Sequence, residues 1–365
     1  MSARIVLFGA TGFTGELTAR ELVARGARPL LVGRNRERVQ ALAGELGVQA
    51  AVVDATAADG DRAIAALLAP GDVLVSTVGP FVRWGEPAVR AAIAARAHYL
   101  DSTGEPPFIR TIFERHGASA AAAGSALLTA MGYDYVPGNL AGALALREAG
   151  AGAVRVDVGY FVGGDPKGQF SGGTRASAAA MLVEPAYAFR DGRVVTVRGA
   201  RHVRRFGSQP AISVGASEQF ALPRLYPELR DVGVWLGWFG PASRPLQALS
   251  GVTALATQLP GVRRALTSSA ERFVKGSTGG PDAATRARAR SKVLAVACDD
   301  AGEELASVRL EGVSPYDFTA ALLAWGAIRA ADGALAGSGA LGPVEAYGLD
   351  ELERGVADAG ISRLA

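Results

Sequence analysis

The stretch Arg4-Ile5-Val6-Leu7-Phe8-Gly9-Ala10-Thr11-Gly12-Phe13-Thr14-Gly15 decides the fold of this chain. Residues 4–8, apolar from Ile5 onward, predict a strand, and the alanine- and leucine-rich residues 15–25 predict a helix that Gly26 closes. Three glycines lie directly between the two elements. At such a helix N-terminus the backbone N–H groups and the helix dipole favour a dinucleotide pyrophosphate. The context therefore predicts a dinucleotide-binding loop rather than a plain turn.

Each residue type in the loop has a physical role. Gly12 lets the backbone approach the pyrophosphate, and Gly15 lets the helix pack closely on the sheet. The hydroxyl groups of Thr11 and Thr14 can add hydrogen-bond donors. The candidate pyrophosphate-binding residues are Gly9, Thr11, Gly12, Phe13, Thr14 and Gly15.

The rest of the first third alternates short apolar runs with helical patterns, which is typical of a doubly wound parallel sheet. The strands are nearly all apolar, as expected where helices cover both faces of a sheet. We predict further strands at residues 29–32, 50–53, 72–76, 98–101 and 126–129. The fold class is therefore α/β, with an N-terminal Rossmann domain.

The pattern changes after Pro137, where a second domain of α+β type is expected. Residues 154–162 alternate like a half-exposed strand, and Asp191-Gly192 predicts a hairpin within residues 189–197. A second hairpin is predicted from residues 286–299 and 304–310. Helices are predicted at 173–182, 314–331 and 349–359, whereas residues 231–270 look apolar and irregular.

The tip of the second strand indicates which cofactor is bound. An NAD-selective site places an acidic residue there, on the ribose 2′-hydroxyl, but this strand ends in Val32-Gly33-Arg34-Asn35. The planar guanidinium of Arg34 can pair with a 2′-phosphate, assisted by Asn35 and Arg38. We therefore predict NADP(H). Asp54, after the third strand, can meet the adenine amino group or can equally cap a turn.

Candidates for the chemical centre follow strands four to six, because Rossmann enzymes hold their ligands at the carboxyl edge of the sheet. The turn formed by Val78, Gly79, Pro80 and Phe81 is expected near the nicotinamide. Tyr133 and Asp134 follow the sixth strand, where they can supply or orient a proton. Glu105, after the fifth strand, is the alternative acid. The competing interpretation is that Tyr133 packs at the hinge and Asp134 caps the next turn.

Composition narrows the classes of function. The net charge of +3 is too small to indicate nucleic acid, and the single cysteine, Cys298, excludes an intramolecular disulfide. The three histidines, His98, His116 and His202, lack metal-site spacing, so no metal is expected. Neither a signal peptide nor a membrane-spanning run is found, which predicts a cytoplasmic protein. No tyrosine has a lysine four residues later, which argues against a short-chain dehydrogenase.

Several motifs together resemble the saccharopine dehydrogenase-like oxidoreductases, and most closely their bacterial branch that includes trans-acting enoyl reductases. The motifs are GATGFTG (9–15), VGPF (78–81), YLDSTGE (99–105), GYDYVPGNLAG (132–142), GPDAATRARARSKV (280–293), SPYDFTA (314–320) and GALGPVEAYG (339–348). The resemblance implies an NADP-binding Rossmann domain at 1–135. It also implies an inserted α+β substrate and dimerisation domain at 136–340, and a segment returning to the first domain at 341–365.

The resemblance leaves the substrate open, because members of the family reduce activated C=C bonds or form C–N bonds of amino acids. We favour NADPH-dependent reduction of an activated C=C bond in a small or acyl, polyketide-like apolar substrate. The alternatives are C=N chemistry on an amino acid, or a non-catalytic NADPH sensor. An amino acid could use Arg175, Arg201, Arg204 and Arg205, and an apolar substrate could use Tyr226, Trp235, Trp238 and Phe239. These tryptophans and Trp325 also suggest a homodimer joined through the second domain.

Overall fold

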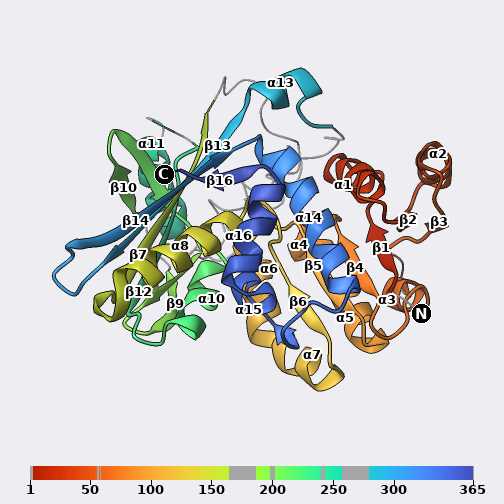
Figure 1. Cartoon of the computed structure of the whole chain (residues 1–365), viewed down its shortest axis with the longest axis horizontal. Helices are drawn as coiled ribbons and strands as arrows, with labels where there is room; N and C mark the ends of the chain where they lie inside the picture. Colours follow the sequence, from red (N-terminus) through yellow and green to blue (C-terminus); the bar gives the residue numbers. More distant parts are fainter. Residues whose placement is uncertain are drawn as a thin grey trace. The chain divides into compact units, whose positions relative to one another are not determined.

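The structure is a computed structural model, and it describes residues 3–55, 57, 59–163, 186–197, 202–238, 240, 243–256 and 279–364. The chain divides into two compact units, and Figure 1 labels most of their helices and strands. Unit 1 comprises Met1–Thr103, Phe108–Val136 and Pro315–Gly360. Unit 2 comprises Gly104–Pro107, Pro137–Ser314 and Ile361–Ala365.

Unit 1 is built on a seven-stranded sheet with the order β15-β6-β5-β4-β1-β2-β3, in which every neighbouring pair is parallel. The strands are β1 (Ile5–Phe8), β2 (Leu30–Gly33), β3 (Ala50–Val52), β4 (Val73–Ser76), β5 (His98–Asp101), β6 (Ala126–Leu128) and β15 (Gly339–Ala340). Six of them are the strands predicted from the sequence. This arrangement confirms the doubly wound Rossmann fold.

Helices connect the strands of unit 1. They are α1 (Phe13–Ala24), α2 (Arg36–Leu46), α3 (Gly60–Ala65), α4 (Phe81–Trp84), α5 (Glu86–Ala95), α6 (Pro106–Thr111), η1 (Ile112–His116), α7 (Gly117–Ala123), α14 (Pro315–Ala331), α15 (Pro343–Tyr347) and α16 (Leu349–Asp358). Helix α14 contacts α1, α16 and the strands β1, β4 and β5, while α5 also contacts β4 and β5. The carboxyl ends of the strands, and the turns after them, thereby acquire a rigid support.

The return of the chain to unit 1 begins at Pro315, earlier than the predicted boundary at residue 341. The reason is packing: α14 is apolar on nearly every side, and it buries Leu322, Leu323 and Trp325. Trp325 stacks on Tyr347 with ring centroids 4.8 Å apart. The last strand, β16 (Ile361–Arg363), pairs with β14 of unit 2 and so does not join the first sheet.

Unit 2 contains a nine-stranded mixed sheet whose main path is β10-β11-β12-β7-β13-β14-β16. Its strands are β7 (Arg155–Gly163), β8 (Ala186–Arg190), β9 (Arg193–Val197), β10 (Val203–Phe206), β11 (Gln209–Ser213), β12 (Asp231–Leu236), β13 (Arg290–Cys298), β14 (Glu304–Gly312) and β16. The helices are α8 (Val136–Ala149), η2 (Gly150–Gly152), α10 (Glu218–Leu225), α11 (Ser243–Ala256) and α13 (Ala283–Arg288). The predicted α+β second domain is confirmed.

The two predicted hairpins of unit 2 are present, with differences at their ends. Strands β8 and β9 turn at Asp191 and Gly192, whose φ angles of 50° and 75° are those of a type I′ turn. The second hairpin begins at Arg290, because the preceding residues form α13 under a side-chain cap from Asp282. Residues 231–270 were expected to be irregular. That expectation is wrong for β12 and α11, while the predicted helix at 173–182 lies outside the described residues.

No helix within the described part of the chain is long and apolar enough to cross a membrane. The one cysteine, Cys298, is buried in β13.

We expect the chain to form a homodimer through its second domain, as the apolar content of that domain suggests. Of the three tryptophans considered, Trp325 belongs to the core of unit 1 and gives no support, which leaves Trp235 and Trp238. Solution scattering at micromolar concentration should report the mass of two chains. A monomer under these conditions would contradict the prediction.

Candidate functional site

The glycine loop presents an open helix N-terminus. Gly12 is the N-cap residue of α1, and its amide donates to the Gly9 carbonyl at 2.9 Å, which closes the turn. Gly9 has a φ of +88°, a region that favours glycine. Gly12 is exposed, and a Cβ atom placed on it would meet only the Gly9 carbonyl oxygen, at 3.3 Å. A pyrophosphate could therefore approach the first amides of α1 without meeting a side chain at position 12.

Gly15 has a different role, because its missing side chain lets α1 approach the loop and β4. A Cβ atom there would overlap the Gly9 carbonyl oxygen and would lie 2.8 Å from Thr77 Oγ1. The Thr77 hydroxyl donates to the carbonyls of Phe8 and Gly9, at 3.2 and 3.1 Å. The glycine loop is thus tied to the turn that follows β4.

The tip of β2 leaves one candidate for the 2′-phosphate without a structural partner. The Asn35 side chain caps α2 by accepting from the Arg38 amide at 2.9 Å. The Arg38 guanidinium donates to the Thr11 carbonyl at 2.9 Å. Arg34 and Arg36 are both exposed, and neither forms a hydrogen bond or ion pair with a described residue. Asp54, also exposed, lies just after β3, as predicted.

We expect NADPH to bind at least tenfold more tightly than NADH, about 1.4 kcal/mol, because Arg34 can form a charge-assisted contact with the 2′-phosphate. Arg34→Ala should remove most of this preference. Arg36→Ala is the matched control, since Arg36 is an equally exposed arginine two residues later. Fluorescence titration with both cofactors measures the effect, and equal affinities in the unmutated protein would refute it.

The four residues predicted in the turn after β4 differ in their exposure to solvent. Gly79 and Pro80 are exposed, and Val78 packs where a side chain on Gly9 would otherwise lie. Phe81 begins α4, is buried, and packs on Phe108 with ring centroids 5.6 Å apart. Phe81 therefore anchors the turn through its buried side chain, and the exposed part of the turn consists of Gly79 and Pro80.

A buried carboxylate that we did not single out in the sequence lies at the end of β5. Asp101 is fully buried, and its Oδ1 accepts from the amides of Thr103 and Ala130, each at 2.9 Å. The Thr129 hydroxyl lies 2.9 Å from its Oδ2. Burial raises the pKa of Asp101 to about 6, although these hydrogen bonds oppose the shift. The clue in the sequence was an aspartate that ends an apolar strand.

Asp101 holds two loops that carry candidate acids. The Thr103 amide begins the loop to Glu105, and the Ala130 amide, at a residue with φ of +60°, begins the loop to Asp134. The Asp101 backbone carbonyl also accepts from Met131 at 2.7 Å. The side chain therefore shapes the edge of the sheet rather than donating a proton itself.

We expect Thr129→Val to lower the free energy of unfolding by about 1.5–3 kcal/mol, because it removes a hydrogen bond to a buried charged acceptor without changing the shape of the side chain. Urea denaturation of the variant and the unmutated protein measures this loss. Identical unfolding midpoints and slopes would show that the hydroxyl does not support Asp101.

The three proposed acids differ in their surroundings. Tyr133 is 2% exposed, its ring lies edge-on to Phe318, and its amide donates to Thr319 Oγ1 at 3.0 Å. Asp134 is half-buried, and its Oδ1 is enclosed without a hydrogen-bond partner among the described residues. Burial raises the pKa of Asp134 to about 7. Glu105 is buried and groups with unit 2. The contacts of Tyr133 with Phe318 and Thr319 thus lie within unit 1.

Other candidates from the sequence have structural partners. Arg204 pairs with buried Asp157, Arg205 donates to the Ser208 carbonyl, and the Tyr226 hydroxyl donates to the Ala143 carbonyl. Arg175, Arg201 and Phe239 lie outside the described residues. Among the residues that the structure covers, no three of His, Cys, Asp and Glu gather as a metal site would require.

Residues 5–130 match the family of saccharopine dehydrogenase NADP binding domains. A putative trans-acting enoyl reductase of Mycobacterium tuberculosis is 43% identical over 185 residues, which are 49% of this chain and 44% of that protein. A trans-acting enoyl reductase of Mycobacterium leprae is 39% identical over 140 residues, which are 37% of this chain and 34% of that protein. The chain thus spans less than half the length of the curated relatives it matches.

The solved structure of saccharopine dehydrogenase (L-Glu forming) from Saccharomyces cerevisiae aligns over 99% of both chains, with a TM-score of 0.60 and 15% identity. At this identity the match shows the shared fold alone. The family match confirms both the resemblance seen in the sequence and NADP(H) as the cofactor. Residues 5–130 are therefore similar to the saccharopine dehydrogenase NADP binding domains, and the curated relatives that match are trans-acting enoyl reductases.

Proposed function

We propose that the chain is an NADPH-dependent reductase of an activated C=C bond in a small or acyl apolar substrate. The observation that carries this proposal is the carboxyl group of Asp134 after β6. Its Oδ1 is enclosed without a hydrogen-bond partner among the described residues, and burial raises the pKa of the carboxyl to about 7. A carboxyl group of this kind is partly protonated at neutral pH and can therefore act as a general acid.

The chemistry divides simply between cofactor and protein. NADPH, when bound, supplies the hydride that forms a C–H bond at the β-carbon and moves the C=C electron pair toward the carbonyl. Asp134 then gives its proton to the α-carbon, so that a saturated product and a carboxylate remain. The first amides of α1, which follow Gly12, would hold the pyrophosphate, and Asp101 shapes the loop that carries Asp134. Tyr133 and Glu105 are the alternative donors of the proton.

The relatives support this choice, because two of them are described as trans-acting enoyl reductases. An amino-acid substrate draws less support, since Arg204 is engaged by a buried carboxylate instead of being available to a ligand. The cytoplasmic location, the homodimer and the inserted substrate domain remain parts of the proposal.

The test is the consumption of NADPH, followed by its absorbance, with two kinds of acceptor. A short α,β-unsaturated thioester such as crotonyl-N-acetylcysteamine represents the C=C reaction, and a 2-oxo acid mixed with a primary amine represents the C=N reaction. We expect turnover with the thioester only. Turnover with the oxo acid and amine alone would assign imine reduction. NADPH binding without turnover of either acceptor would favour the sensor.

A further inference from the structure

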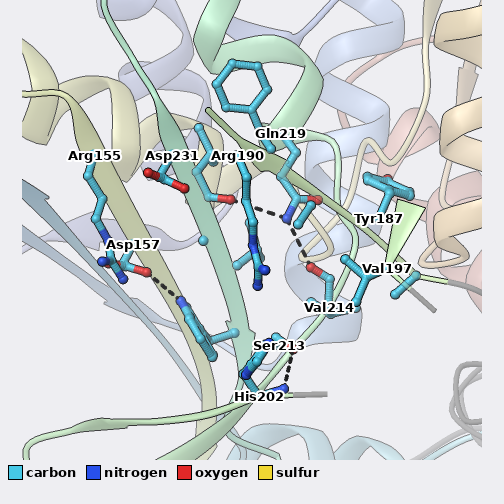
Figure 2. Close-up of a pocket in the computed structure, with 17 residues that line it drawn as sticks. Arg155, Asp157, Tyr187, Arg190, Val197, His202, Ser213, Val214, Gln219 and Asp231 are labelled. Atoms are coloured by element: carbon cyan, nitrogen blue, oxygen red, sulfur yellow. Dashed lines mark hydrogen bonds and ion pairs between the residues drawn. The ribbon is translucent and has the colours of Figure 1, made fainter. Parts of the chain in front are cut away.

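Unit 2 contains a pocket of about 270 Å³ beside strand β12, shown in Figure 2. Along one edge, β12 pairs with β7 over its whole length. Along the other edge it pairs with β11 at Trp235 and Leu236, and with β8 at Val232. The pocket is lined by residues of these four strands and of β9, together with Gln219 of α10, His202 and Val214.

One wall of the pocket is held in place by a buried carboxylate that accepts three hydrogen bonds. Asp157 is fully buried and accepts from Arg155 Nε at 2.8 Å, Arg204 Nη1 at 2.6 Å and Trp235 Nε1 at 2.8 Å. Gly233 leaves room for this group, because a Cβ atom there would overlap Asp157 Oδ1. These contacts hold Arg155 and Trp235 in place at the pocket without help from a ligand, and such preorganisation is typical of a binding site.

Two further charged side chains at the pocket, Arg190 and Asp231, form no hydrogen bond or ion pair with a described residue, although Arg155 and Arg190 act electrostatically on Asp231 and oppose the rise in its pKa that burial causes. Arg190 ends β8, and its guanidinium forms no hydrogen bond or ion pair with a described residue. Asp231 begins β12, is half-buried, and its carboxyl likewise has no hydrogen bond within the described chain. Figure 2 shows the Arg190 side chain between the labelled Asp231 and His202. Burial raises the pKa of Asp231, as expected for a carboxyl that lacks donors.

We propose that this pocket binds a small organic acid that carries a hydrogen-bond donor next to its carboxylate and an aromatic or apolar body. The carboxylate would pair with Arg190, and the donor, a hydroxyl or amino group, would bind Asp231. Phe189, Val197 and Trp235 line the same pocket and would contact the apolar body. Two arginines (155 and 190) and two aspartates (157 and 231) line the pocket, and Arg204, which pairs with Asp157 from outside the lining, adds one positive charge that favours an anion.

The size of the pocket limits the ligand. Sites for drug-sized molecules hold about 300–1,000 Å³, so this pocket of about 270 Å³ fits a ligand smaller than a typical drug. All of its lining residues belong to unit 2, and the inference does not depend on the proposed reaction.

Three matched probes test the chemistry by isothermal titration of the full chain. Mandelate has a phenyl ring, a carboxylate and a hydroxyl; phenylacetate lacks the hydroxyl, and 1-phenylethane-1,2-diol lacks the carboxylate. We expect mandelate to bind about tenfold more tightly than either relative, the difference typical of one charge-assisted hydrogen bond. Phenylglycine, the amino counterpart of mandelate, distinguishes an amino acid from a hydroxy acid as the preferred source. Failure of mandelate and phenylglycine to bind at millimolar concentration would overturn the proposal.

Variants then locate the site. Arg190→Gln and Asp231→Asn should each weaken binding of the preferred acid by about tenfold. Arg193→Gln is the control, because Arg193 pairs with Arg190 across the β8–β9 hairpin, is exposed and does not line the pocket. Equal affinity in Arg190→Gln and Arg193→Gln would overturn the assignment. NADPH affinity should stay the same in all three variants, which separates this result from a failure of the proposed reductase function.

Discussion

Gly12→Val should abolish NADPH binding and leave the melting temperature nearly unchanged. Gly12 is exposed, and a Cβ there would meet only one carbonyl oxygen, that of Gly9 at 3.3 Å, which has to move by a few tenths of an ångström. The branched side chain would occupy the space in front of the α1 amides, where the pyrophosphate must approach. We expect a loss of affinity of a hundredfold or more, about 2.8 kcal/mol. Fluorescence titration and a thermal melt measure the two quantities.

Gly15→Ala is the matched comparison and should behave in the opposite way. Its Cβ would overlap the backbone carbonyl of Gly9 and press on Thr77 Oγ1, so α1 would have to move. Overpacking of this kind costs about 1–3 kcal/mol of stability. We therefore expect a lower melting temperature for Gly15→Ala than for Gly12→Val. If Gly12→Val binds NADPH normally, the loop is not the cofactor site.

Asp134→Asn should lower turnover of the accepted substrate by about a hundredfold at unchanged NADPH affinity, because the amide keeps the shape of the carboxyl but cannot donate its proton. In the unmutated protein the rate should fall as the pH rises through about 7, where this carboxyl loses its proton. Tyr133→Phe and Glu105→Gln test the two alternative donors in the same assay. Full activity of Asp134→Asn would transfer the role to whichever of these variants is inactive.

The pKa of Asp134 also has a consequence for stability that needs no substrate. The folded-state pKa of about 7 lies above the ordinary value of 3.8, so the folded protein binds this proton more tightly than the unfolded chain. The resulting stabilisation is complete below the unfolded pKa and is lost as the pH rises through about 7. Asp134→Asn should remove this part of the pH dependence. Denaturant midpoints at acidic and mildly alkaline pH, compared between the two proteins, provide the measurement.

Local sequence determined the first unit and its cofactor. The strand, glycine loop and helix of residues 4–25 follow from short-range physics, since apolar periodicity and backbone freedom are properties of neighbouring residues. The same holds for the strand ends, where Arg34 and Asp134 could be named in advance. The hairpin at Asp191-Gly192 was equally local, because positive φ angles at both turn residues are enough to specify it.

Tertiary structure decided the features that depend on contacts between distant residues. Helix α14 could be located in the sequence, but only its packing on α1 and the first sheet assigns it to unit 1. The supporting role of Asp101 could not be predicted from the sequence, because its hydrogen-bond partner Ala130 is 29 residues away. The pocket of unit 2 requires Arg190 and Asp231 from different strands, and no periodicity in the sequence brings them together. Such contacts arise from sheet topology and long-range pairing, which a single sequence does not encode in any local pattern.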